Sequence, residues 1–208
     1  MYLNALLPGY PGRWVRISGG GDTWFAEITL TYPDSTWLGV VACEVKGDRI
    51  WKETAWFCPT DVSIERRDRL TVPMGEVQSG FHESSGSPAD QKRHERTLDR
   101  FYSSLASGVS PSEVLSENTT IQFPQTFDAV RGRSDISDLY SSSPIRTAVV
   151  HQRWVLGGSA LVELRTPKPD GAILHLIHFD GDQISRISDY WAPKLDAPSW
   201  RAEFVEPI

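Results

Sequence analysis

Histidines in the second half of the chain are the side chains best suited to proton transfer or metal binding. His175 and His178 lie three positions apart in a segment that alternates as a strand does. Because successive side chains of a strand point to opposite faces, residues three apart cannot bind one metal ion together. One of the two is therefore expected to point into the protein and the other outward. His151, in an earlier predicted strand, is better placed to form a dyad with a carboxylate, in which the imidazole exchanges protons near neutral pH.

The composition argues against several classes of partner and cofactor. The chain has 208 residues, with 21 lysines and arginines against 27 aspartates and glutamates, for a net charge of −6. Nucleic acids and anionic membranes attract a basic surface, so neither is expected as a partner. The sequence has no glycine-rich phosphate loop and no zinc-binding spacing. We therefore expect neither a metal nor a nucleotide cofactor.

The sequence gives no sign of a membrane span or of secretion. No apolar run has the ~18 residues that a membrane-spanning helix needs, and residues 1–4 lack the charged leader of a signal peptide. A cytoplasmic location is therefore expected. The two cysteines, Cys43 and Cys58, both fall in predicted strands and are expected to be buried, reduced thiols.

One block of the sequence occurs twice, 134 positions apart. Segment 45–59 returns as 179–193, with identical residues at four places, Gly47 and Gly181, Asp48 and Asp182, Ile50 and Ile184, Pro59 and Pro193. Such self-similarity predicts two related structural units. Within its own unit the second block has roughly ninety residues before it and the first has barely half that number, so we expect the first unit to lack an N-terminal portion. We expect a partial domain over 1–76, a Ser- and Gly-rich linker over 77–90 and a complete domain over 91–208.

The complete domain reads as helices followed by a long antiparallel meander. Apolar residues recur at helical spacing over 98–105, between a cap near Asp90 and a stop at Gly108. A capping-box pattern at 110–113 predicts a second, short helix, and 132–142 a third. These elements predict an α+β fold in which a curved antiparallel sheet wraps three N-terminal helices as a cone. The first unit reads as strands, a second and helix-depleted antiparallel sheet.

The order of these elements and the end of the meander resemble a known family. Segment 179–193 reads FDGDQISRISDYWAP, and with the helices before it the chain is similar to the SnoaL-like polyketide cyclase branch of the nuclear transport factor 2-like (NTF2-like) superfamily. The resemblance covers residue 91 to the C-terminus as one complete domain, and residues 2–61 as the sheet half of another. It implies the cone fold, a hydrophobic pocket at the open end of the cone, and a sheet that pairs with another sheet.

The resemblance also implies a catalytic carboxylate at Asp189, directly before the aromatic pair of the last strand. A carboxylate enclosed by apolar walls has a raised pKa, which suits it to taking a proton from carbon or water. The first unit has Ala55 at the matching position, so the chemistry is assigned to the second unit. The expected partners in acid–base catalysis are Glu163, His151 and Tyr102.

Two better-defined relatives test the site residue by residue. Limonene epoxide hydrolase-like enzymes have Arg-x-Asp where this chain has Leu-Val-Glu at 161–163. The acid of that motif is therefore retained as Glu163, but the arginine is not. Arg165 lies on the same strand face as Glu163 and could take the place of that arginine. Ketosteroid isomerase-like enzymes have a tyrosine and an aspartate where Phe101 and Phe123 stand. This disfavours an isomerase of that type and leaves Tyr102 as a neighbouring phenol. The substrate pocket is expected to include Phe101, Phe123, His175 and Trp191.

Two functions fit the sequence. The first is a small-molecule enzyme that works by general acid–base catalysis on an apolar substrate, polyketide-, terpenoid- or steroid-like, as a cyclase, isomerase or hydrolase. The second is a non-catalytic ligand-binding or assembly module. Five of the eight tryptophans lie in the first unit, where they form either a ligand wall or, as we favour, a sheet-to-sheet interface. Through such an interface the chain is expected to form a homodimer or an intramolecular pseudo-dimer.

Overall fold

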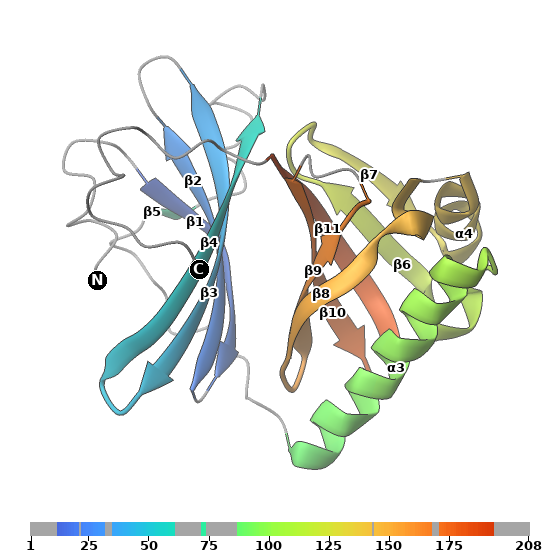
Figure 1. Ribbon diagram of the computed structural model, residues 1–208, viewed down its shortest axis with the longest axis horizontal. Coiled ribbons are helices and arrows are strands. Elements are labelled where there is room, and N and C mark those ends of the chain that lie inside the picture. Colours follow the sequence, from blue (N-terminus) through green and yellow to red (C-terminus); the bar gives the residue numbers. More distant parts are fainter. Residues whose placement is uncertain are drawn as a thin grey trace.

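The computed structural model describes residues 12–20, 22–31, 35–60, 72–73, 87–142, 144–167 and 171–193. Within these residues the chain forms two β-sheets that stand side by side, and two α-helices on the face of the second sheet that is turned away from the first (Figure 1). The architecture is mixed α+β and mostly sheet, as the sequence predicts.

The first sheet is built from the N-terminal part of the chain. It holds β1 (Gly12–Gly20), β2 (Thr23–Thr31), β3 (Thr36–Lys46), β4 (Arg49–Thr60) and the short β5 (Val72–Pro73), in the order β4-β3-β2-β1-β5. All neighbouring strands in it are antiparallel. The prediction of an antiparallel meander in the first unit is confirmed.

The second sheet is built from the C-terminal part. It holds β6 (Leu115–Phe123), β7 (Asp128–Arg131), β8 (Val149–Val155), β9 (Ser159–Arg165), β10 (Gly171–Asp180) and β11 (Gln183–Pro193), in the order β7-β6-β11-β10-β9-β8. A 3-10 turn over Pro144–Thr147 leads into β8. The last four strands form the predicted antiparallel meander. However, β6 pairs with β11 in parallel, so a wholly antiparallel sheet is wrong. The two strands are far apart in the chain, and no hairpin forces them to run in opposite directions.

Helix α3 (Pro88–Ser107) lies across the second sheet (Figure 1). Its first turn carries a capping box, in which the Ser87 hydroxyl accepts from the backbone N–H of Asp90 and the Asp90 carboxylate accepts from the backbone N–H of Ser87, both at 3.1 Å. Gly108, at φ +70°, ends the helix as predicted. The helix starts three residues before the predicted domain boundary, and residues 77–86 of the predicted linker lie outside the described residues.

The prediction of three N-terminal helices is wrong for the described residues. Helix α4 (Arg133–Ser142) forms where the third was expected, but it follows β6 and β7, and the expected second helix is a single 3-10 turn over Ser112–Val114. Leu115 is already extended and fully buried, and the β-branched residues Thr119, Thr120 and Ile121 that follow favour a strand. Glu113 forms an ion pair with Arg100 of α3 at 3.0 Å, so its side chain is engaged away from the cap.

The two sheets share their strand order and two local irregularities. The order β4-β3-β2-β1 returns as β11-β10-β9-β8. A bulge interrupts the β3–β4 pairing at 44–45 and the β10–β11 pairing at 178–179, which is 134 positions later. The hairpin turns that follow contain Gly47 at φ +64° and Gly181 at φ +58°, a left-handed conformation that favours glycine. The sequence offset therefore corresponds to matching backbone geometry.

Apolar cores cover both faces of the second sheet. On the face that we call the helix face, the sheet packs on the two helices through a core that includes Leu98, Phe101, Ile136, Tyr140, Ile173, Ile177 and Ile187. On the face that we call the inter-sheet face, it packs on the first sheet through a core that includes Phe25, Leu38, Val40, Trp56, Leu161, Leu174, Leu176 and Tyr190. Along β10 the odd-numbered residues therefore point to the helix face and the even-numbered ones to the first sheet.

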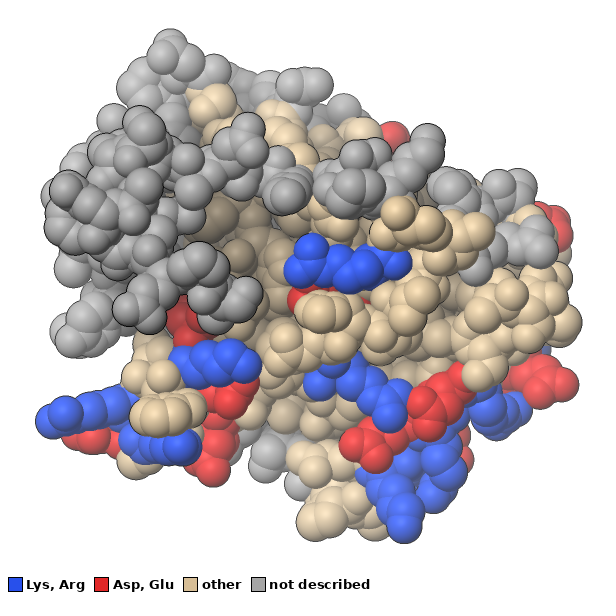
Figure 2. All heavy atoms as spheres, viewed as in Figure 1, with Lys and Arg blue, Asp and Glu red and all other residues tan. Residues whose placement is uncertain are grey.

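Charges of both signs are interspersed on the surface that Figure 2 shows, with no broad patch of a single sign. Arg93 of α3 contacts Asp182 in the β10–β11 turn at 2.6 Å, and Arg153 of β8 contacts Asp99 of α3 at 2.5 Å. These ion pairs connect the helix to the edge and to one end of the sheet. Among the described residues, no helix has the length and apolar character needed to cross a membrane.

Candidate functional site

His175 and Asp189 face each other across β10 and β11 on the helix face of the second sheet. They are direct partners in the strand register, and their exposed fractions are 0% and 5%. His175 Nε2 lies 3.7 Å from Asp189 Oδ2, which is longer than a hydrogen bond, so the two groups are close neighbours without a direct hydrogen bond. The two residues form a buried imidazole–carboxylate dyad.

Tyr102 extends the dyad from the helix above it. Its hydroxyl lies 2.9 Å from His175 Nδ1, and the phenol and imidazole rings are nearly parallel at 17°. A protonated tyrosine donates to Nδ1, which leaves the imidazole proton on Nε2, on the side of Asp189. The three side chains thus form a chain of polar contacts from α3 through β10 to β11.

Tyr140 brings a second phenol to the same place from α4. Its side chain is buried, and its ring centroid lies 6.3 Å from that of His175. Burial raises the pKa of both Tyr102 and Tyr140 well above the usual value, and the negative charge of Asp189 raises each pKa further. Both phenols therefore stay protonated and can donate hydrogen bonds over the whole neutral range.

Three polar atoms of this cluster are buried without a hydrogen-bond partner in the described part of the chain. They are Oδ1 of Asp189, the hydroxyl oxygen of Tyr140 and Nε2 of His175. Buried polar groups are rarely left unsatisfied, because each costs free energy comparable to a lost hydrogen bond. One acceptor, on Asp189, and two donors, on Tyr140 and His175, are thus available to a third molecule. No group of three or more metal-binding side chains occurs among the residues described.

The structure does not bring the other predicted partners to Asp189. Glu163 is buried on the inter-sheet face, the opposite side of the sheet, where it forms an ion pair with Arg165 at 2.5 Å. His151 is exposed at a bulge in the β8–β9 pairing. The expected dyad of Asp189 with His151 is replaced by one with His175, because the bulge removes His151 from the regular register while His175 lies directly opposite Asp189.

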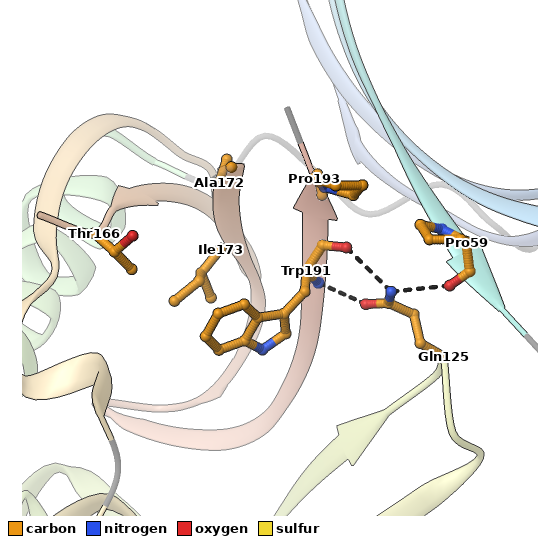
Figure 3. A pocket seen from close by; sticks show the side chains of 9 residues that line it. Pro59, Gln125, Thr166, Ala172, Ile173, Trp191 and Pro193 are labelled. Atoms are coloured by element: carbon orange, nitrogen blue, oxygen red, sulfur yellow. Dashed lines mark hydrogen bonds between the residues drawn. The ribbon is translucent and has the colours of Figure 1, made fainter. Parts of the chain in front are cut away.

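A pocket of about 270 Å³ lies where β10 begins and β11 ends (Figure 3). Its lining residues are Pro59, Gln125, Thr166, Gly171, Ala172, Ile173, Trp191, Ala192 and Pro193. Ile173 and Trp191 are direct strand partners, two positions along from His175 and Asp189 on the same face. Two residues of strand correspond to about 7 Å, so the pocket lies about that far along β10 and β11 from the dyad, and neither His175 nor Asp189 lines it.

Of the predicted pocket residues, Trp191 alone lines this pocket. Phe101 is fully buried in the core and packs edge-on against Tyr102 and Tyr140, while Phe123 is partly buried against the same core. His175 belongs to the dyad itself. Phe101 therefore positions the phenols of the site and does not line the pocket.

Two residues of the site were missed by sequence reasoning. Tyr140 belongs by its spacing to the apolar stripe of α4, and a tyrosine next to isoleucine and leucine is a weak sign of a polar role. Gln125, in the β6–β7 turn, donates from Nε2 to the carbonyls of Pro59 and Trp191 at 3.0 and 3.1 Å, and its Oε1 accepts from the Trp191 N–H at 2.6 Å (Figure 3). No sequence pattern marks such a contact.

Comparison with known proteins places the fold. No family model and no curated protein matches the chain. An NTF2-like protein of unknown function from Burkholderia xenovorans LB400 is similar in structure, with a TM-score of 0.51 and 16% identity over 57% of this chain and 98% of that one. The fold of this part of the chain is NTF2-like. At this identity the likeness establishes the fold alone.

Two further solved structures with this fold have weaker similarity. A putative ketosteroid isomerase from Kribbella flavida DSM 17836 gives a TM-score of 0.49 at 21% identity, over 57% of this chain and 92% of that one. A steroid delta-isomerase from Pseudomonas aeruginosa gives 0.42 at 15% identity, over 53% and 85%. The NTF2-like fold carries unrelated functions, so any activity has to be argued from the site itself.

Proposed function

We propose that the chain is a small-molecule enzyme of the SnoaL-like type that transfers protons by general acid–base catalysis, with no cofactor, in the cone of its second unit. The observation that carries the proposal is the buried dyad of Asp189 and His175, with the hydroxyl of Tyr102 on the far nitrogen of the imidazole. Ionisable groups that converge in an apolar enclosure are common at catalytic sites.

The unpartnered atoms suggest the chemistry. Oδ1 of Asp189 accepts a proton from a carbon next to a carbonyl, the C–H electron pair moves into the new C=C bond, and the carbonyl oxygen gains negative charge. The hydroxyl of Tyr140 donates a hydrogen bond to that oxygen. Return of the proton from Asp189 to another carbon gives an isomer and regenerates the carboxylate. In a ring closure, the enolate carbon instead forms a bond to a second carbonyl carbon of the substrate, and the oxygen of that carbonyl takes the proton from Asp189. His175 and Tyr102 are positioning residues that hold Asp189.

The pocket indicates the size and charge of the substrate. None of its lining residues carries a charge, and most of them are apolar. A volume of about 270 Å³ lies just below the range of ~300–1,000 Å³ that holds drug-sized ligands. A neutral, apolar carbonyl compound of one or two rings, lying against the indole of Trp191, fits these properties better than a four-ring steroid.

Proton exchange tests the proposal without knowledge of the product. Neutral one- and two-ring ketones are incubated in D2O with the protein, and the loss of the proton next to the carbonyl is followed by NMR. We expect exchange with the wild type and a rate lower by ~10²–10⁴ for Asp189→Asn. Glu163→Gln is the matched control, because it removes a buried carboxylate on the opposite face and should leave the rate unchanged. Equal rates for Asp189→Asn and wild type would contradict the proposal.

The second candidate function is a non-catalytic binding or assembly module, in which the first unit is a related copy that serves as partner for the second. The apolar core between the two sheets favours it, because this core occupies the inter-sheet face of the second sheet. The same experiment separates the two functions. Ligands that bind in the pocket without any exchange, in the wild type as in Asp189→Asn, would support the module.

A further inference from the structure

The core between the two sheets is made from equivalent positions of both. Five positions of the first sheet in this core have their counterparts, 134 residues later, in the same core: Leu38 and Ala172, Val40 and Leu174, Ala42 and Leu176, Trp56 and Tyr190, Cys58 and Ala192. In addition, β4 contacts its own counterpart, β11. An interface in which both partners use the same patch is the mark of two-fold pairing between two copies of one unit. The first sheet is thus seated on the second as a second copy would be.

A buried polar contact in this interface breaks the equivalence. The hydroxyl of Tyr190 donates to the carboxylate of Glu27, and both side chains are buried. The counterparts of this pair are Trp56 and Leu161, which lie in the same core and are apolar at these positions. A polar pair therefore stands on one side of the pseudo-two-fold axis and an apolar pair on the other.

We propose that the first sheet takes the place of a second copy of this chain on the inter-sheet face, and that the Glu27–Tyr190 pair selects the pairing of unlike sheets. If two second sheets paired, each Tyr190 hydroxyl would meet Leu161, which has no acceptor. If two first sheets paired, each Glu27 would meet Trp56 and lose the hydroxyl of Tyr190. Loss of this buried hydrogen bond on both sides disfavours both arrangements, so the full chain does not dimerise through this face. This inference is independent of the proposed chemistry.

A double-mutant cycle on the apolar side tests the geometry. Leu161→Glu in the full chain introduces a buried carboxylate at the position that the two-fold relation puts opposite Trp56, and it should lower the urea midpoint of unfolding. Trp56→Tyr added to it supplies a hydroxyl in the place that Tyr190 has on the other side. We expect the double variant to recover at least half of the midpoint lost by Leu161→Glu. No recovery would overturn the two-fold relation. Leu161→Gln, which is neutral, gives the same cycle if the glutamate variant does not fold.

The mass of the same variants in solution tests whether the Glu27–Tyr190 pair selects the pairing of unlike sheets. In the double variant both sheets carry an acid and a hydroxyl, so like sheets can also pair, and we expect a dimer whose fraction rises with concentration in light scattering. The wild type should show no such concentration dependence through this face. A double variant that recovers its midpoint and stays as monomeric as the wild type would overturn the selecting role of the Glu27–Tyr190 pair. A wild-type dimer that Leu161→Glu dissociates would overturn the proposal as a whole.

Discussion

Val41 lies directly opposite Ala55 in the first sheet, at the place where the second sheet pairs His175 with Asp189. The same strand register thus holds an apolar pair in one sheet and an ionisable pair in the other. The first sheet shows that the position can be filled without polar atoms, so the dyad is not required by the sheet. This contrast is a physical reason to regard the dyad as functional.

Removing one member of the dyad should therefore lower the free energy of unfolding, and replacing both members should lower it by less than the sum of the two single changes. His175→Val alone leaves the carboxylate of Asp189 buried without its polar neighbour, and a buried polar group that loses a partner costs about 1–3 kcal/mol. Adding Asp189→Ala, which recreates the pair of the first sheet, should cost less than the sum of the two single changes. Urea unfolding of both single variants and the double variant measures this coupling. Strictly additive costs would show that the two residues do not interact.

Tyr140→Phe should slow proton exchange and spare the fold. The change removes only the hydroxyl, which has no partner among the described residues, so we expect the melting temperature to stay the same or rise. If the hydroxyl stabilises negative charge on the substrate oxygen, the exchange rate should fall by about 10²–10³. The NMR assay in D2O measures the rate. A rate equal to that of the wild type would remove Tyr140 from the mechanism.

The two phenols should limit stability in alkali. Burial and the charge of Asp189 hold the pKa of Tyr102 and Tyr140 well above the value near 10 of the unfolded chain. Below pH ~10 both states hold these protons, and above it the unfolded state loses them first, so stability falls as pH rises by roughly 1.4 kcal/mol per unit for each phenol.

Urea unfolding between pH 8 and 11 measures this fall. In the variant Tyr102→Phe with Tyr140→Phe the fall above pH ~10 should be shallower, because two of the protons that couple folding to pH are gone. The same slope in wild type and variant would show that other groups control alkaline unfolding.

The alkylation rate of Cys58 should depend on the charge of Asp189. Burial and the charge of Asp189 raise the pKa of the Cys58 thiol to about 12, while burial and Glu53 raise that of Cys43 to about 11. Alkylation needs the thiolate, so Cys58 should react more slowly than Cys43 in the native protein. Asp189→Asn removes one of the two causes at Cys58 and should speed its alkylation. Mass spectrometry with iodoacetamide follows both thiols, and Cys43 serves as the internal control. An unchanged rate at Cys58 would contradict this coupling.

The sequence predicts the strands of both units and the main helix because their signals are local. Alternation along the strands, the capping residues of α3 and the stop at Gly108 each act within a few residues. The predicted second helix does not form because Leu115 pairs with β11 as part of a strand, and this tertiary pairing overrides the local capping pattern.

The site is less predictable because it depends on register. The alternation of side chains along a strand shows that His175 and His178 point to opposite faces. Which of these faces meets the helices depends on how the sheets pack. The bulge that places His151 outside the pairing with β9 leaves no mark in the sequence. The structure does not place Glu163 beside Asp189 for the same reason. The sequence shows that residue 163 is acidic, but it does not show which face of the sheet the side chain lies on.

Gln125 joins the end of the first sheet, at Pro59, to the end of the second, at Trp191. Both of these residues line the pocket, so a bound ligand contacts the two units at once. Binding energy gained there opposes any separation of the units. With a saturating ligand, the two sheets should melt as one cooperative transition at a higher temperature, even if each has its own transition when the pocket is empty.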